Sequence, residues 1–264
     1  MSQFLKYIKI YFALVKASTI ADMQYRLNYL TRFLTDIFWY IAQIMMYEVI
    51  YLHTKKIGTW QIEQTRVFLG LLFVIDALYT IIFAENVDRM SDKVRKGDLD
   101  LLLAKPINSQ FMISLQKVNT SIIGNLIISI SWLIYSLRQM NDFSFSQLAW
   151  LIILIPSSLC IFYSFRFIIS ASAVIFTKSD NLQYMWYQVY KLGMRPDSIY
   201  FPKLRFLLMT IIPVSLIASV PSRIIFQDAS MELTLWTMMM GPIALYFSTK
   251  FWNFCLSKYS SASS

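Results

Sequence analysis

The chain has 264 residues, of which 57% are hydrophobic and only 15% are charged, whereas soluble domains have roughly 45–50% and about 25%. This composition predicts an integral membrane protein whose solvent is the bilayer. Its six glycines form neither the GxxxxGKS/T nor the GxGxxG loop that cradles nucleotide phosphates, and one histidine with two cysteines cannot supply a zinc site or a disulfide framework. We therefore expect no catalytic centre, and no cofactor or metal bound by this chain.

The first twenty residues combine lysines with apolar side chains, which is also the pattern of a signal peptide. Lys9 and Lys16 interrupt the apolar run, however, and no small-residue cleavage site follows. Plotted as a helix, the segment places Lys6, Lys9 and Lys16 on one stripe and apolar side chains on the other. We expect an N-terminal amphipathic helix on the cytoplasmic membrane surface, with a cytoplasmic extension of the first span as the alternative.

Six apolar runs match or approach the roughly 20 residues that a spanning helix needs. They cover residues 33–52, 67–84, 118–137, 143–170, 206–222 and 233–252. The fifth run is short and contains Pro213 and Pro221, so we expect it to break, with residues 221–228 forming a re-entrant or surface turn. The sequence thus predicts one all-α transmembrane domain over residues 1–264, a polytopic bundle of six spans, with a frayed serine-rich tail at 260–264.

The basic residues are distributed unevenly between the two sides of this topology. With the N-terminus inside, 18 of the 24 lysines and arginines fall on the cytoplasmic side, in residues 1–32, 85–117 and 178–205 and after residue 249. Only five fall on the opposite side, which favours cytoplasmic termini. We expect the membrane to be a bacterial-type inner membrane. The net charge of +9 is then explained by topology rather than by a nucleic-acid partner.

The segment between the second and third spans, residues 85–106, is unusually charged. Glu85 with Arg89, and Asp92 with Lys96, are acid-first i,i+4 pairs that favour a helix. Gly97 is expected to end this helix in the left-handed conformation. The pattern predicts a helix, a kink and a second short helix.

The second short helix is expected over residues 99–104, with Asp98 as its N-cap and Lys105-Pro106 as its end. Four leucines, at positions 99, 101, 102 and 103, make it apolar. It must therefore lie on the membrane, on the bundle or in the groove of a partner. The alternative is a solvated hairpin loop without a partner.

Polar side chains inside the predicted spans need partners or water, because a charge at mid-bilayer costs about 2.5–3.5 kcal/mol on insertion scales. Asp76 could line a pathway together with Asn125 and Arg166, or could hydrogen-bond structurally to Thr80 or Asn125. Arg166 could instead extend to the lipid phosphates. Asp36 and Glu48, near opposite ends of the first span, are expected at the interfaces.

Several stretches of the chain resemble the permease subunits of ABC-type exporters of the type-2 group. The most specific are Arg95–Asp100 and Leu102–Asn108, and the others are Met23–Arg26, Ile57–Trp60 and Ile211–Pro213 with Pro221. The resemblance runs from about residue 20 to the C-terminus, and Asp98 stands where the family pattern has glutamate. It implies a permease dimer whose second copy is identical or related, and a separate ATPase subunit, carrying ATP and Mg, docked on the cytoplasmic loops.

The function that we expect is ATP-driven export of an amphipathic or lipid-like substrate by alternating access. The residues expected at the ATPase contact are Arg95, Lys96, Gly97, Asp98, Asp100, Lys105 and Pro106. The alternative from another class is a membrane scaffold or assembly factor without a transport path, followed by a membrane-embedded enzyme. The sequence leaves the cargo open, because no ordered set of polar residues points to one head group.

Overall fold

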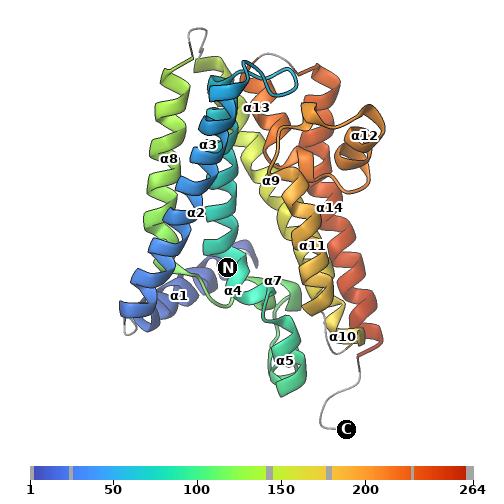
Figure 1. Cartoon of the computed structure of the whole chain (residues 1–264). Coiled ribbons are helices and arrows are strands. Elements are labelled where there is room, and N and C mark those ends of the chain that lie inside the picture. Colours follow the sequence, from blue (N-terminus) through green and yellow to red (C-terminus); the bar gives the residue numbers. More distant parts are fainter. Residues whose placement is uncertain (1–2, 24–25, 141–144, 177–179, 227–228, 260–264) are drawn as a thin grey trace.

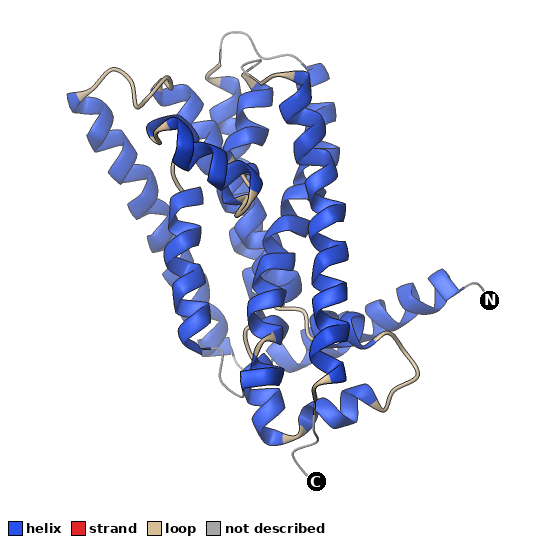
Figure 2. Cartoon of the chain, turned by 90° about the vertical axis from the view of Figure 1, so that its right-hand side faces the viewer, coloured by secondary structure: helices blue, strands red, loops and turns tan. Residues whose placement is uncertain are grey.

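A computed structural model describes residues 3–23, 26–140, 145–176, 180–226 and 229–259, and the regular secondary structure in these ranges consists of helices joined by loops. Figure 2 shows helices and no strand in these ranges. The expected tail at 260–264, the beginning of the fourth apolar run at 143–144 and part of the Met23–Arg26 stretch lie outside the described residues. The predicted all-α fold class is confirmed.

The long helices form an upright bundle, with α1 lying across one of its ends (Figures 1 and 2). The bundle helices are α2 (Arg26–His53), α3 (Ile62–Tyr79), α8 (Ile123–Arg138), α9 (Phe145–Ala171), α11 (Asp180–Gly193) and α14 (Met231–Ser257). One end of the bundle carries α1 (Gln3–Met23) and the short helix α5 (Met90–Lys96). We call it the hairpin end, because α5 and the short helix after it form a helical hairpin there. The opposite end, which carries residues 54–61, is called the loop end.

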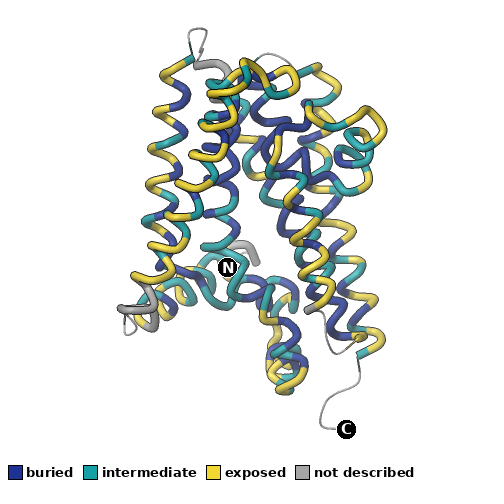
Figure 3. The backbone as a smooth tube through the Cα atoms, in the orientation of Figure 1, coloured by how far each residue is buried: buried dark blue, intermediate teal, exposed yellow. Residues whose placement is uncertain are grey.

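Four helical segments are long and apolar enough to cross a membrane: 30–53, 62–96, 120–138 and 149–176. They correspond to the first four predicted runs, and α2 and α8 turn many exposed residues outward (Figure 3). A fifth candidate is the pair formed by α12 (Pro202–Thr210) and residues 214–225. The chain is thus an all-α membrane protein with four to five candidate spans. Within the described residues, α14 has 27 residues but is not among these candidates.

The core surrounds α3 and the contact between α9 and α14. Residues 67–75 of α3 are almost completely buried. A Cβ atom on Gly241 of α14 would lie 2.8 Å from Ser157 Cα of α9, so only glycine allows this close approach. The Ser157 hydroxyl donates to the Thr237 carbonyl oxygen at 2.6 Å. Small residues and hydroxyl groups therefore join these two helices, as is common between helices in membranes.

The fifth predicted run, 206–222, is not one straight helix, which confirms the expected break. The axes of α12 and the following helical segment differ by 75°, and Pro213 lies between them. The surface turn expected from Pro221 is wrong up to Ile225, because Ser219–Ile225 form the buried helix α13, and the re-entrant alternative stays a prediction. Pro221 is accommodated in the first turn of α13, where the backbone N–H has no partner within the helix. Residues 227–228 lie outside the described residues.

Helix α11 runs along the bundle, so the basic residues that follow it lie at a different end from the one predicted from sequence. Gln183 near its beginning donates to the Asp88 carbonyl oxygen at 3.3 Å, and Met194 just after its end accepts from the Tyr47 hydroxyl at 3.2 Å. Asp88 lies toward the hairpin end and Tyr47 toward the loop end. Residues 195–205, which the sequence assigned to the cytoplasmic loop, therefore lie with α12 at the loop end (Figure 1). The difference in basic residues between the two ends is therefore smaller than predicted, because Arg195, Lys203 and Arg205 lie at the loop end.

Candidate functional sites

The charged segment forms a hairpin that projects from the bundle (Figure 1). It consists of α5 and α6 (Asp98–Leu103), joined by Gly97 with φ 75° and ψ 4°. The predicted left-handed end of the first helix at Gly97 is thereby confirmed. The predicted N-cap is wrong, because Gly97 serves both helices as their shared cap and Asp98 becomes the first residue of α6.

The leucines of α6 face in two directions. Leu99 and Leu102 are buried and belong to the core together with Val94 of α5, whereas Leu101 is 70% exposed. Asp92 pairs with Arg95, three residues on, rather than with Lys96 as expected. The hairpin is thus a packed unit with one outward apolar side chain rather than an unstructured loop.

The structure brings the expected ATPase-contact residues together on this hairpin and the chain that follows it. Arg95, Lys96, Asp98, Lys105 and Pro106 are exposed, and Asp100 is half-buried. No atom of the described residues beyond its chain neighbours lies within 4 Å of a Cβ built on Gly97. The hairpin therefore presents both signs of charge and open space around its turn.

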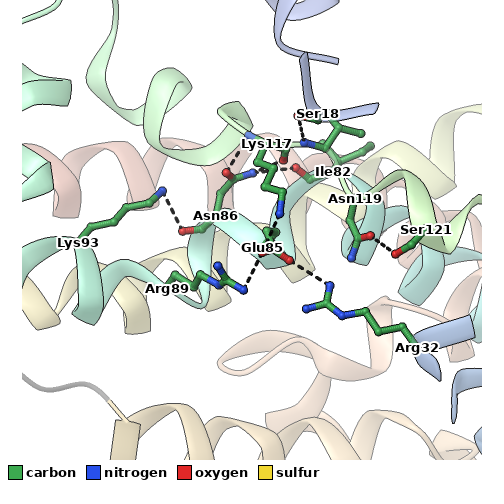
Figure 4. A network of polar contacts seen from close by, with 11 residues as sticks. Ser18, Arg32, Ile82, Glu85, Asn86, Arg89, Lys93, Lys117, Asn119 and Ser121 are labelled. Carbon is green, nitrogen blue, oxygen red and sulfur yellow. Dashed lines mark hydrogen bonds and ion pairs between the residues drawn. The ribbon is translucent and has the colours of Figure 1, made fainter. Parts of the chain in front are cut away.

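Glu85 anchors the base of the hairpin (Figure 4). Its side chain is 7% exposed and pairs with Arg32 at 3.2 Å, Arg89 at 2.8 Å and Lys117 at 3.2 Å. The predicted i,i+4 pair of Glu85 and Arg89 is confirmed. Because Arg32 comes from α2 and Lys117 follows α7 (Ser109–Leu115), one carboxylate holds together three separate parts of the chain.

Asn86 strengthens the same base, and sequence reasoning missed it. Its side-chain amide donates to the carbonyl oxygens of Ser114 at 3.0 Å and Lys117 at 2.6 Å, and its Oδ1 accepts from the Lys117 backbone N–H at 2.9 Å. Lys93 of α5 in turn donates to the Asn86 carbonyl oxygen at 3.4 Å (Figure 4). These bonds connect the hairpin to the bundle through polar groups that a local sequence pattern does not reveal.

A second candidate site is a cavity of about 410 Å³ between α2, α3, α9 and α11. Asp76 and Arg166 both line it, so the structure brings together two of the three predicted pathway residues. Asn125 is fully buried and donates to Asp36 Oδ2 at 2.6 Å. Asp36, expected at an interface, lines the cavity instead.

Arg166 is paired inside the protein instead of extending to lipid phosphates. Its guanidinium forms an ion pair with Asp88, and its Nε donates to the Tyr79 hydroxyl at 3.3 Å. The side chain of Arg166 is 15% exposed and that of Asp88 is 35% exposed. Sequence reasoning placed Asp88 in the charged segment and had no signal that it would turn toward span four.

Asp76 faces the cavity without the partners that a structural role would give it. The Thr80 hydroxyl donates to the backbone carbonyl oxygen of Asp76 at 2.8 Å, and Asn125 is engaged by Asp36. In the described part of the chain, no hydrogen bond reaches the Asp76 carboxylate. Both structural partners that the sequence suggested are therefore wrong for this carboxylate.

The fold and these two sites define an all-α integral membrane component with a charged hairpin at one end and a polar cavity among its spans. A family model described as "ABC-2 family transporter protein" matches residues 37–263. Because the match covers most of the chain, the protein belongs to the ABC-2 family of transporter membrane proteins, and the predicted family is confirmed. No curated protein and no solved structure matches the chain. Membership implies an ATPase partner in general, with the membrane component itself typically non-catalytic.

Proposed function

We propose that the chain is the permease subunit of an ATP-driven exporter and that the α5–α6 hairpin receives the motion of the ATPase. The observation that carries this proposal is the projection of a compact charged hairpin beyond the bundle (Figure 1). A moving ATPase can shift the spans only through an element that does not deform on contact. The buried leucines of α6 and the polar base at Glu85 and Asn86 give the hairpin that rigidity.

The proposed topology has six crossings, made by α2, α3, α8, α9, α11 and α14. In this arrangement α12 and α13 form a re-entrant segment at the loop end, and both termini lie in the cytoplasm with the hairpin. The membrane is a bacterial-type inner membrane. The position of Gln183 near Asp88 and of Met194 near Tyr47 supports α11 as the fifth crossing.

In the proposed mechanism, two permease copies, identical or related, alternate between inward and outward access for an amphipathic substrate. ATP and Mg are held by the separate ATPase subunits. Arg95, Lys96, Asp98, Asp100, Lys105 and Pro106 form the contact with the ATPase, and Gly97 sets the angle of the two hairpin helices. The cavity around Asp76 and Arg166 lies on the substrate path.

Reversing one exposed charge on the hairpin tests this proposal. The permease is co-expressed with an ABC ATPase from the same genome, and the ATPase that co-purifies is quantified together with ATP-driven export from vesicles. We expect Asp98→Lys to reduce both by about tenfold, as expected for loss of one contact worth about 1.4 kcal/mol. The matched control is Glu232→Lys, which reverses an exposed acid in the first turn of α14 at the loop end.

The proposal predicts that the control retains the ATPase and transport. Wild-type ATPase yield and wild-type export in Asp98→Lys would contradict it. Such a result would favour a hairpin that is only solvated, and a membrane component that acts as a scaffold.

A further inference from the structure

We propose that the cavity between α2, α3, α9 and α11 binds a hydrophobic organic cation. This inference names the substrate class of the exporter proposed above and rests on that proposal. It is carried by the charge of the cavity, its aromatic wall and two polar groups on that wall that lack a protein partner.

The described residues that line the cavity carry a net negative charge. The carboxylates of Asp36, Asp76 and Asp88 face the guanidinium of Arg166 alone. Arg166 is committed to Asp88 by an ion pair, and Asp36 accepts a hydrogen bond from neutral Asn125. The Asp76 carboxylate therefore lacks a cation of its own. A negative site with low-dielectric walls attracts positive ligands and repels anions.

The aromatic wall supplies a second attraction for the same charge. The ring of Phe162 stacks on Tyr79 at a centroid distance of 4.3 Å and on Tyr190 at 4.5 Å, and Trp186 extends this stack. Aromatic faces attract cations, most strongly when both are removed from water. The Arg166 guanidinium carbon lies 6.0 Å from the Tyr79 ring centroid, so the wall already carries one such contact.

Two polar atoms on this wall have no partner in the described part of the chain. They are the Trp186 indole N–H and the Tyr190 hydroxyl, and both residues are only 4% exposed. A buried donor without a partner costs free energy unless a ligand or water engages it. Their presence beside Asp76 indicates a site that is completed by a bound molecule with polar atoms.

The dimensions and donor set favour an organic cation over a metal ion. The cavity of about 410 Å³ lies in the size range of small-molecule sites and is lined by large aromatic rings. Among the described residues, no group of three or more His, Cys, Asp and Glu side chains is arranged to hold a metal ion. The ligand must therefore combine a positive charge with an apolar body.

Tetraphenylphosphonium and tetraphenylborate test the sign of charge, because they have nearly the same shape and opposite charges. Each is titrated separately into the full-length permease in nanodiscs of neutral lipid, and binding to empty nanodiscs is subtracted. We expect saturable binding of tetraphenylphosphonium only. Asp76→Asn should weaken it by about tenfold, because one close opposite charge is lost. The matched control, Glu232→Gln, removes an exposed carboxylate outside the cavity and should leave binding unchanged.

A substitution series at Trp39, another ring that lines the cavity, separates aromatic attraction from simple apolar burial. Trp39→Phe should retain most of the cation affinity, whereas Trp39→Leu should weaken it by about threefold to tenfold. All variants must elute at the wild-type position in size-exclusion chromatography, so that misfolded protein is not scored.

Preference for tetraphenylborate, or equal binding of both ions, would overturn the inference. Unchanged affinity in Asp76→Asn would also overturn it. Failure of the proposed exporter function would be seen in a different measurement, because ATPase co-purification and ATP-driven export are assayed without either ion. If the ATPase co-purifies and export of a neutral or anionic substrate is ATP-driven, the exporter stands and the cation class is wrong.

Discussion

The α5–α6 hairpin and the cavity use the same kinds of charged side chain in opposite surroundings. On the hairpin, Arg95 and Asp92 pair while each remains about half exposed, at 49% and 48%. Such a pair contributes only about 0–1 kcal/mol, and its charges can be redirected to a partner protein. In the cavity, Arg166 and Asp88 pair at 15% and 35% exposure. Loss of one partner there leaves a poorly solvated charge, so the pair is committed to the structure.

In the proposed transport cycle, this difference separates contacts that change from contacts that hold the spans in place. The exposed charges of the hairpin would exchange water for the surface of the proposed ATPase partner at little cost. The cavity holds one fixed pair, Arg166 with Asp88, beside the carboxylate of Asp76, which has no cation of its own. The proposed cation would therefore meet a cavity in which Arg166 is already paired, and in which Asp36 and Asp76 have no ion-pair partner among the lining residues.

The largest expected effect concerns α11, which forms one wall of the cavity and must cross the membrane if the cavity lies between spans. In a background lacking Cys160 and Cys255, Ile199→Cys places a thiol at a residue that is 39% exposed at the loop end. We expect a membrane-impermeant maleimide to label it fully in intact cells. The matched variant Ala104→Cys, at the exposed end of α6, should be labelled only after permeabilisation.

Protection of Ile199→Cys in intact cells would contradict the six crossings and would return residues 178–205 to the cytoplasm. In that case the cavity would not be enclosed by spans. The hairpin and the α11 wall of the cavity would then both lie in the cytoplasm.

The next largest effect is a loss in the free energy of unfolding, expected when the ion pair in the cavity is broken. Arg166→Met leaves the Asp88 carboxylate without its cation, and we expect a loss at the lower end of about 3–5 kcal/mol. The lower end is expected because Asp88 remains partly exposed to the cavity. The measurement is unfolding by sodium dodecyl sulfate in mixed micelles.

The double variant Arg166→Met with Asp88→Leu is the control, since it removes both charges. It should be more stable than Arg166→Met alone, because no unpaired charge remains. Equal stability of the single and double variants would show that the pair is solvated in the same way as the hairpin pairs.

The hairpin could be predicted from sequence because its signals are local. Gly97 ends a helix by its own backbone freedom, and the pair of Glu85 and Arg89 is fixed by helical spacing. The N-cap at Asp98 was wrong because one left-handed residue serves both helices. The break at Pro213 was also predictable, since proline lacks a backbone donor.

The cavity could not be predicted in the same way, because its residues come from four helices that are distant in sequence. Asp76 and Arg166 were recognisable as charges in apolar runs. Their neighbours Asp36, Asp88 and Tyr190 were not, since only the course of α11 brings Tyr190 to Phe162. Helix α11 itself is too polar to be marked by hydropathy, although its Trp186, Tyr187 and Tyr190 line the cavity.

The smallest expected effect is at Gly97 and tests whether the hairpin acts through its angle or only through its charge. Space is not limiting there, so a substitution is opposed by the backbone conformation alone, φ 75°. A residue with a Cβ atom costs about 1–2 kcal/mol in this region, and asparagine tolerates it better than a β-branched residue.

We expect Gly97→Val to reduce ATPase co-purification by about 5–30-fold, the factor that corresponds to this free energy. Gly97→Asn should retain most of it, and any loss of stability measured for Gly97→Val by detergent unfolding should not exceed about 1–2 kcal/mol. Equal ATPase recovery with valine and asparagine would show that the angle between α5 and α6 is irrelevant, and that the exposed charges alone make the contact.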